Sequence, residues 1–161
     1  MIVKAEKIHR AFVLSTWVRS YVDATPLDKS IVLKSEPRRA EIAFDTGSVW
    51  VDTSDGYTVN GWVCGVRGAF VSNGSKYATE EEAEDHNDRY CMTHSGEWRD
   101  GLLHWVYVPP ELRNLGMGTK LILETVGSNP EVTSQCRKKR SSAHKTSLPL
   151  GRFNPYRMWE F

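Results

Sequence analysis

The sequence predicts one α/β domain, and three observations indicate it. With 161 residues the chain has the usual length of a single domain and can bury a core. Residues 8 to 22 carry apolar side chains at helical spacing, whereas residues 48 to 66 contain strand-like runs. Residues 102 to 108 form another strand-like run, which leads through a glycine-containing turn into a helical run at residues 119 to 126. Helices that alternate with strands indicate an α/β fold.

Composition and charge argue against several classes of protein. Apolar residues make up 40% of the chain and charged residues 25%, with a net charge of +1, as in ordinary globular proteins. Such a chain has no overall attraction to nucleic acid or to an anionic membrane, so we expect neither as a partner. The first residues lack the apolar stretch of a signal peptide, and no apolar run could span a bilayer. Three widely spaced cysteines fit free thiols, so we expect a cytoplasmic protein.

Two helices are expected ahead of the first long strand. The first covers residues 8 to 22. Its apolar face is formed by Ile8, Phe12, Ser15, Val18 and Val22. Ser35 and Pro37 have the spacing of an N-cap and a first-turn proline, which predicts a short second helix that ends near Gly47. Its apolar side is lined by Ala40, Ala43 and Phe44.

Residues 48 to 52 and 57 to 66 are expected to form strands, because both are rich in valine and aromatic residues. Asp55-Gly56 is the expected hairpin turn between them. Asn60-Gly61 is either another tight turn or a bulge. We expect Trp50, Trp62 and Phe70 to be core residues.

The rest of the chain alternates polar segments with short apolar ones. Thr79 to Glu82 have the form of a capping box, which predicts a helix whose acidic face, up to Asp88, is either solvated or attracts a basic substrate. The C-terminal part is expected to hold the end of a helix at residues 127 to 130, a further helical turn at 131 to 140, a strand at 140 to 144 and a turn at 148 to 151.

The turn between the strand at 102 to 108 and the helix at 119 to 126 carries the clearest functional signal. It places two glycines, Gly116 and Gly118, where the helix opens, so several backbone N–H groups lie without intrahelical acceptors at the positive end of the helix dipole. Glycine has no Cβ, which lets an anion come close to the backbone. The turn therefore predicts a phosphate site, although it matches neither the dinucleotide fingerprint nor the mononucleotide loop.

From Val108 to Leu121 the sequence reads V-x-P-E-x-R-x-x-G-x-G-x-x-L, which closely resembles the acetyl-CoA pyrophosphate loop of the GCN5-related N-acetyltransferase (GNAT) superfamily. An ordinary strand-turn-helix is the alternative. The resemblance implies a mixed, mostly antiparallel central sheet that is flanked by helices and splayed between its fourth and fifth strands. It also implies acetyl-CoA as co-substrate. The implied cofactor-binding residues are Val106, Val108, Arg113, Asn114, Leu115, Gly116, Met117, Gly118 and Thr119.

Further segments are similar to small, phage-encoded acetyltransferase-like proteins. They are Ser15 to Tyr21, His104 to Val108, Ala143 to Thr146 and Phe153 to Tyr156, in the expected order. Small relatives have only a short connection where this chain has residues 71 to 100, so we expect an insertion there within a single domain spanning residues 1 to 161. The resemblance implies an amine acceptor, either a host protein or a small molecule, in the host cytoplasm.

Acetyl transfer to an amine needs oriented substrates, a donor for the oxyanion and a base. His104 is the first candidate base, because strand alternation places it on one face with Val106 and Val108; a structural histidine is the alternative. Tyr156 is the candidate acid, since a tyrosine near the thiol commonly protonates the thiolate in this family; packing is the alternative. His144 corresponds to the histidine of the relatives' T-H-x-T segment, although Ala143 replaces the preceding threonine.

Two other groups of residues could bind ligands. The basic run at residues 137 to 140 either contacts the 3′-phosphate of CoA or is solvated. Cys64, His86, Cys91 and His94 include zinc-ligand types, but no second paired motif supports them and we expect no metal site. A non-catalytic protein that keeps the fold and acts by contact with a host protein is the alternative to an enzyme.

Overall fold

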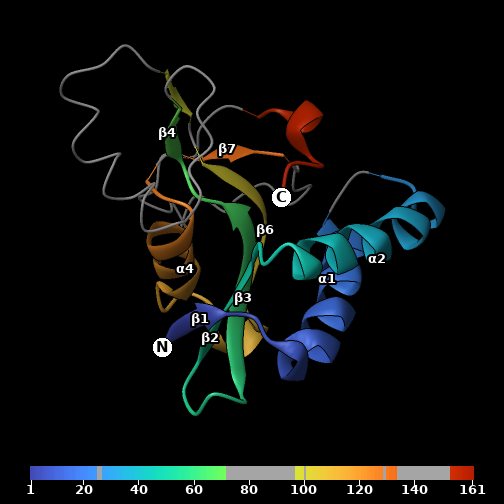
Figure 1. The fold of residues 1–161 in the computed structure, drawn as a ribbon. Coiled ribbons are helices and arrows are strands. Elements are labelled where there is room, and N and C mark those ends of the chain that lie inside the picture. The colour runs from blue at the N-terminus through green and yellow to red at the C-terminus, as the bar shows by residue number, and fades with distance from the viewer. Residues whose placement is uncertain (25–26, 72–96, 100, 129, 134–152) are drawn as a thin grey trace.

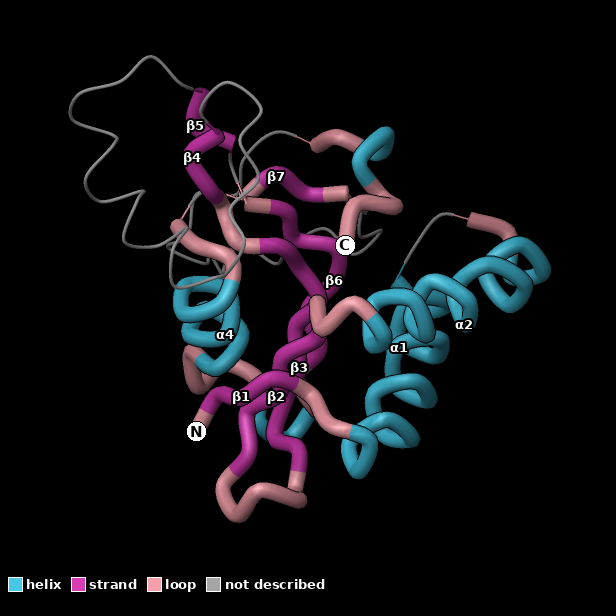
Figure 2. Tube along the Cα trace, viewed as in Figure 1, coloured by secondary structure: helices cyan, strands magenta, loops and turns pink. Residues whose placement is uncertain are grey.

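A five-stranded sheet lies between two helical layers (Figures 1 and 2). The computed structural model describes residues 1–24, 27–71, 97–99, 101–128, 130–133 and 153–161, with only the backbone path of 69–71 and 97–99. Helices α1 (Arg10–Ala24) and α2 (Lys29–Asp45) cover one face of the sheet, and α4 (Met117–Thr125) covers the other. The predicted α/β class is confirmed.

The sheet is mixed and mostly antiparallel, as expected. Its strands are, in spatial order, β1 (Ile2–Lys4), β2 (Val49–Thr53), β3 (Val59–Val66), β6 (Leu102–Tyr107) and β7 (Glu131–Val132). Only β6 and β7 are parallel, and they pair through Leu102 with Glu131 and Leu103 with Val132. Beyond Leu103, β6 pairs with no strand of the described residues on that side. The described part of β7 ends there, so the splay expected between the fourth and fifth strands stays a prediction.

Two short strands flank the segment expected to be an insertion. Strands β4 (Ala69–Val71) and β5 (Glu97–Arg99) pair antiparallel, so both ends of residues 72–96 meet beside the main sheet. The predicted acidic helix lies outside the described residues. That residues 71 to 100 form an insertion stays a prediction.

The core consists of two clusters, one on each face of the sheet. On the α1 and α2 face, the rings of Trp17 and Trp62 stack with centroids 5.1 Å apart. On the α4 face, Leu121 and Ile122 pack against Val63. Alternation along β3 sends Trp62 to one cluster and Val63 to the other. Because both faces bury large apolar side chains, the sheet is a fully covered central layer.

Helix α1 is present where the sequence predicts it, but its buried face is a different one. The buried side chains are Val13, Trp17 and Tyr21, whereas Ile8 is 57% exposed. A short 3₁₀ turn, η1 (Lys7–His9), precedes the helix and holds Ile8 outside it. Two apolar stripes overlap in this sequence, and the stripe with the large rings of Trp17 and Tyr21 faces the sheet because it buries more apolar area.

Helix α2 begins earlier than predicted. Asp28, and not Ser35, is the N-cap, and its carboxylate accepts a hydrogen bond from Ser30 N at 2.8 Å. Hydrogen bonds from Ser30 lower the pKa of Asp28. Pro37 lies inside the helix on its exposed side, where the carbonyl of Leu33 that lacks a Pro37 N–H partner can bind water. The predicted end near Gly47 is confirmed.

The predicted hairpin turn at Asp55-Gly56 is confirmed, since Gly56 has a φ of 84°. The Asp55 carboxylate accepts bonds from the backbone N–H groups of Thr58 and Tyr57, which lower its pKa to about 2. Asn60 is the extra residue of a bulge, because Asp52 pairs with Gly61 and Thr53 with Val59. The sequence allowed a turn or a bulge at this position, and the structure shows the bulge.

The core and C-terminal predictions hold in part. Trp62 is fully buried, and Trp50 is half-buried against the α4 cluster. The side chain of Phe70 lies outside the described residues, as do the predicted strand at 140 to 144 and the turn at 148 to 151. The helical turn predicted from residue 131 is wrong at its start, because β7 pairs with β6 there instead.

Candidate active site

A bulge in β6 shapes the strand that the sequence singles out. Cys64 pairs with Trp105 and Gly65 with Leu103, so His104 is an extra residue in β6. An extra residue interrupts strict alternation and re-aims the side chains on either side of it. Trp105 and Tyr107 consequently pack on the α1 side, whereas Leu103 and Val106 pack on the α4 side. The predicted shared face of His104 and Val106 is therefore not formed.

A groove of about 570 Å³ lies between α1, β6 and the turn that opens α4. One wall is the α1 face with Thr16, Arg19, Ser20, Asp23 and Ala24. The floor is the end of β6, from Trp105 to Tyr107, together with Val108, and the far wall is made by Pro110, Arg113 and Gly118. A groove of this volume is in the range of small-molecule sites, which is roughly 300–1,000 Å³.

The turn beside this groove has the backbone conformation of an anion site. Asn114 and Gly116 both have positive φ angles, 70° and 77°, and Gly116 caps α4 without a side-chain bond. The amide N–H groups from Asn114 to Thr119 donate to no acceptor among the described residues. Successive N–H groups in such a turn form a concavity for anions, and the helix dipole adds to its positive potential. A phosphate-bearing ligand is the group that these amides suit best.

Arg113 and Gly118 connect the turn to the strand. The Arg113 Nε donates to the Val108 carbonyl at 2.9 Å, which fixes the turn against the end of β6. A Cβ placed on Gly118 would lie 3.6 Å from Val108 Cγ2 and 3.9 Å from Val106 Cγ2, in ordinary contact. Four predicted cofactor residues thus line the groove: Val106, Val108, Arg113 and Gly118.

Two hydroxyl groups of α1 accept hydrogen bonds from tryptophan indoles of the sheet. Thr16 Oγ1 donates to the Phe12 carbonyl at 2.7 Å and accepts from Trp62 Nε1 at 2.8 Å. Ser20 Oγ donates to the Trp17 carbonyl and accepts from Trp105 Nε1 at 3.0 Å. These contacts set the width of the groove by fixing α1 on β3 and β6.

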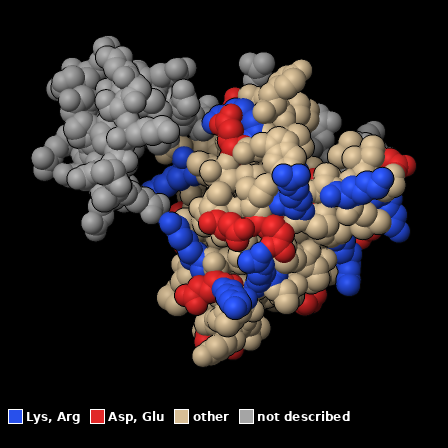
Figure 3. Space-filling model, turned by 45° about the vertical axis from the view of Figure 1, so that its right-hand side comes forward, with Lys and Arg blue, Asp and Glu red and all other residues tan. Residues whose placement is uncertain are grey.

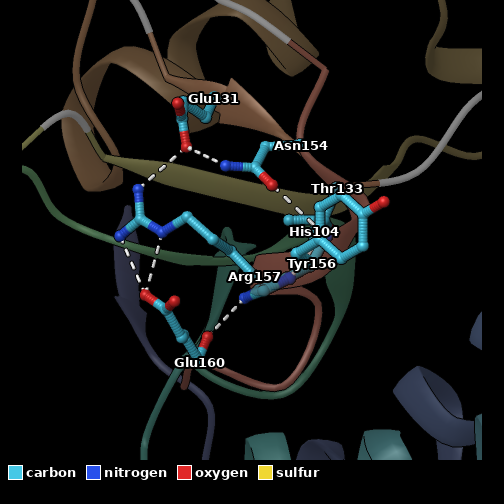
Figure 4. Close-up of polar contacts among 7 residues, drawn as sticks. All are labelled: His104, Glu131, Thr133, Asn154, Tyr156, Arg157 and Glu160. Atoms are coloured by element: carbon cyan, nitrogen blue, oxygen red, sulfur yellow. Dashed lines mark hydrogen bonds and ion pairs between the residues drawn. The ribbon is translucent and has the colours of Figure 1, made fainter.

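His104, the predicted base, is 1% exposed and does not line the groove. Its Nε2 lies 2.7 Å from the Glu160 carbonyl, which can only accept, so Nε2 carries the proton. Its Nδ1 lone pair therefore accepts from the Thr133 hydroxyl at 2.9 Å (Figure 4). Burial lowers the pKa of His104 to about 4. Both ring nitrogens are bonded within the protein, which favours the structural alternative.

Tyr156, the predicted acid, is 94% exposed and does not line the groove. It belongs to a short 3₁₀ turn, η3 (Pro155–Arg157), that Arg157 ties to β7 through Glu131 at 2.9 Å (Figure 4). His144, the acidic helix and the basic run at 137 to 140 lie outside the described residues. Neither His104 nor Tyr156 thus lies in the groove, and the catalytic roles of His104, Tyr156 and His144 stay predictions.

The other lining residues of the groove were not predicted as site residues from the sequence, and Arg19, Asp23 and Tyr107 are the chemically most relevant of them. Tyr107 is half-buried, and its ring stacks on Trp62 with centroids 6.0 Å apart. Arg19 and Ser20 lie three and four residues after Thr16, and Asp23 lies four and three residues after them, which is the signal that places the four on one helix face.

Within the described ranges, no group of histidine, cysteine, aspartate or glutamate side chains could hold a metal ion. Cys64 is buried, and desolvation raises the pKa of its thiol, which makes it a poor ligand. Cys91, His86 and His94 lie outside those ranges. On the face seen in Figure 3, acidic and basic side chains are interspersed over the described surface. None of the helices that the structure describes is long and apolar enough to cross a membrane.

No family profile matches the chain, and no curated protein sequence matches it. Among solved structures, the chain is similar to an N-acetyltransferase from Staphylococcus aureus Mu50, with 14% sequence identity. The match covers 77% of this chain and 73% of that chain, with a TM-score of 0.44.

Proposed function

We propose that the protein is an acetyl-CoA-dependent N-acetyltransferase, whose turn at Arg113 to Thr119 binds the coenzyme diphosphate. The observation that carries this proposal is the row of backbone N–H groups, from Asn114 to Thr119, without an acceptor among the described residues and beside a groove. The resemblance of Val108 to Leu121 to the pyrophosphate loop of N-acetyltransferases supports the same ligand. The resemblance to phage-encoded proteins extends the proposal to an acceptor in a bacterial host.

The groove offers a place for the arm of the coenzyme. A diphosphate on the turn directs the rest of the ligand along the end of β6, where Val106 and Val108 line the groove next to Gly118. Beyond Leu103, the edge of β6 away from β3 has no described strand neighbour, so a ligand can pair with its backbone there; the Val108 carbonyl itself accepts from Arg113 Nε. Val106 and Val108 are the residues we assign to this pairing.

The transfer itself needs little covalent chemistry from the protein. The neutral amine attacks the thioester carbonyl carbon, a C–N bond forms, and the C–S bond breaks. Of the two protons that leave the acceptor ammonium, one ends on the thiolate of coenzyme A and the other passes to solvent. Holding the two reactants side by side supplies much of the rate enhancement. Tyr107 is the groove residue with a hydroxyl that has no described hydrogen-bond partner, and it is our candidate donor to the thiolate.

Calorimetry of acetyl-CoA with the wild type and Gly118→Leu tests the coenzyme site. The backbone at Gly118 accepts a Cβ without a clash, so the variant should fold while its side chain occupies the groove. We expect the affinity to fall at least about 100-fold, or about 2.7 kcal/mol. Glu124→Ala, on the exposed side of the same helix, is the matched control and should bind like the wild type. Equal affinity of Gly118→Leu and the control would refute the assignment of the turn.

A binding protein that keeps the coenzyme site without catalysis is the second candidate. It is favoured by one observation, namely that His104 and Tyr156 lie outside the groove. Acetyl-CoA binding without release of coenzyme A, over a broad panel of amines, would support it. Release of coenzyme A that depends on an amine would exclude it.

A further inference from the structure

The groove contains polar side chains that the protein already uses and others that it does not. The hydroxyl groups of Thr16 and Ser20 donate hydrogen bonds to carbonyls of α1 and accept hydrogen bonds from indole N–H groups. Arg19 and Asp23 line the same wall, yet neither forms a hydrogen bond or ion pair with any residue in the described part of the chain. Two opposite charges are therefore available to a ligand in the groove.

Arg19 and Asp23 also border a second hollow. This hollow has a volume of about 580 Å³ and lies between α1 and α2. Its apolar lining comes from Leu14, Val18, Val22 and Leu33, and Lys29 of α2 adds a second positive charge to its rim. The two charged residues are four apart on one helix, or about 6 Å along its axis, so they form a polar border between the groove and the apolar hollow.

The charges at this border select among possible acceptors. A cationic amine is attracted by Asp23 but repelled by Arg19 and Lys29, whereas an anion is attracted by the two cations and repelled by Asp23. A zwitterion pairs with both residues at once, and a guanidinium suits a carboxylate because it can bond it bidentately. The apolar hollow next to the pair further favours a ligand with an apolar side chain over a polar one.

We propose that this border binds an apolar α-amino acid as the acetyl acceptor. Its carboxylate pairs with Arg19, its amino group lies at Asp23 facing the groove, and its side chain enters the hollow between α1 and α2. This inference rests on the proposed acetyltransferase function, since the amino group is the nucleophile that attacks the thioester. Arg19 and Asp23 bind and orient this acceptor, and Leu33 contributes to the preference for its side chain.

Steady-state acetylation of the twenty L-amino acids, with acetyl-CoA and detection of each product by mass, tests this inference. We expect leucine and phenylalanine to exceed serine, glutamate and lysine in kcat/KM. Leucinamide and isopentylamine, which lack the carboxylate, should fall about tenfold or more below leucine. Arg19→Gln should lower kcat/KM for leucine about tenfold and leave that for leucinamide within twofold. Leu33→Ser should weaken the preference for leucine over serine.

Controls separate this inference from the proposed function. Arg38→Gln removes an exposed arginine outside the groove and should match the wild type. Calorimetry should show unchanged acetyl-CoA affinity for Arg38→Gln, and Arg19→Gln and Asp23→Asn should still bind acetyl-CoA, so that a loss of acetylation is assigned to the acceptor. Bound acetyl-CoA with none of the twenty amino acids acetylated, or equal rates for leucine and leucinamide, would overturn the inference and leave the coenzyme site standing. Failure of the wild type to bind acetyl-CoA would overturn both.

Discussion

The turn that opens α4 and the buried polar cluster around His104 and Arg39 differ in whether their polar groups have hydrogen-bond partners within the protein. In the turn, the N–H groups from Asn114 to Thr119 have no described acceptor. In the cluster, almost every buried polar atom has one, and Arg39 Nε is the single buried side-chain nitrogen or oxygen without a partner in the described chain. Unused polar groups at a surface groove are available to a ligand, whereas bonded and buried ones hold the fold.

The cluster joins parts of the chain that are far apart in sequence. Glu36 accepts from Trp17 Nε1 at 2.9 Å and from Arg39 Nη1 at 2.9 Å, and Arg39 Nη2 donates to the Met158 carbonyl at 3.2 Å. His104 in turn bonds the Glu160 carbonyl. His104, the base predicted from the sequence, and Arg39 thus hold the C-terminal segment, while glycines and backbone amides form the proposed ligand site.

The largest effect is expected on breaking the buried ion pair. Glu36→Ala leaves the Arg39 guanidinium, which is 1% exposed, without its carboxylate. Removal of one partner of such a pair costs about 3–5 kcal/mol of the free energy of unfolding. Urea denaturation measures this cost. An unchanged free energy of unfolding would show that the cluster does not hold the fold.

A smaller effect is expected from pH, through His104. Its pKa of about 4 in the folded protein lies below its ordinary value of 6.5, so the unfolded chain binds more protons between these values. Stability is therefore complete above about pH 6.5 and decreases, by about 3 kcal/mol, as the pH falls through 6.5 toward 4. The difference between wild type and His104→Gln in denaturant titrations from pH 7 to 4 isolates this contribution. Parallel pH profiles of the two proteins would contradict it.

The smallest of these effects is expected at Arg113. Arg113→Gln removes the Nε bond to Val108 and one positive charge near the turn. We expect acetyl-CoA binding to weaken about tenfold, or about 1.4 kcal/mol. Because Arg113 is exposed, stability should change by no more than about 0.5 kcal/mol. A variant that loses stability but keeps its affinity for acetyl-CoA would place Arg113 with the structural cluster instead.

The fold was predictable where local patterns decide it. The strands at 48 to 66, the turn at Asp55-Gly56 and the strand-turn-helix from Leu102 to Thr125 follow from residue type and spacing. The start of α2 was not predictable from Ser35 and Pro37. The helix begins at the N-cap Asp28 instead, and it tolerates Pro37 because this proline lies on its exposed side. The sequence of α1 carries two overlapping apolar stripes, and packing against the sheet decides which of them is buried.

The candidate site was predictable in its backbone part alone. Gly116 predicts a turn at the start of the helix, because its positive φ of 77° is readily adopted by a residue without a Cβ. The role of His104 could not be read from strand alternation, since the bulge that interrupts it is set by pairing with β3. Its partners Thr133 and Glu160 are 29 and 56 residues away, and no local pattern reveals them.

The most direct measurement is a ¹H–¹⁵N spectrum of the protein titrated with coenzyme A. If the free amides of the turn hold the diphosphate, the largest shifts will fall on Asn114 to Thr119, with smaller ones along Val106 and Val108, while the His104 ring signals stay unchanged. Unchanged amide signals from Asn114 to Thr119 at saturating coenzyme A, with the largest shifts elsewhere, would contradict the account.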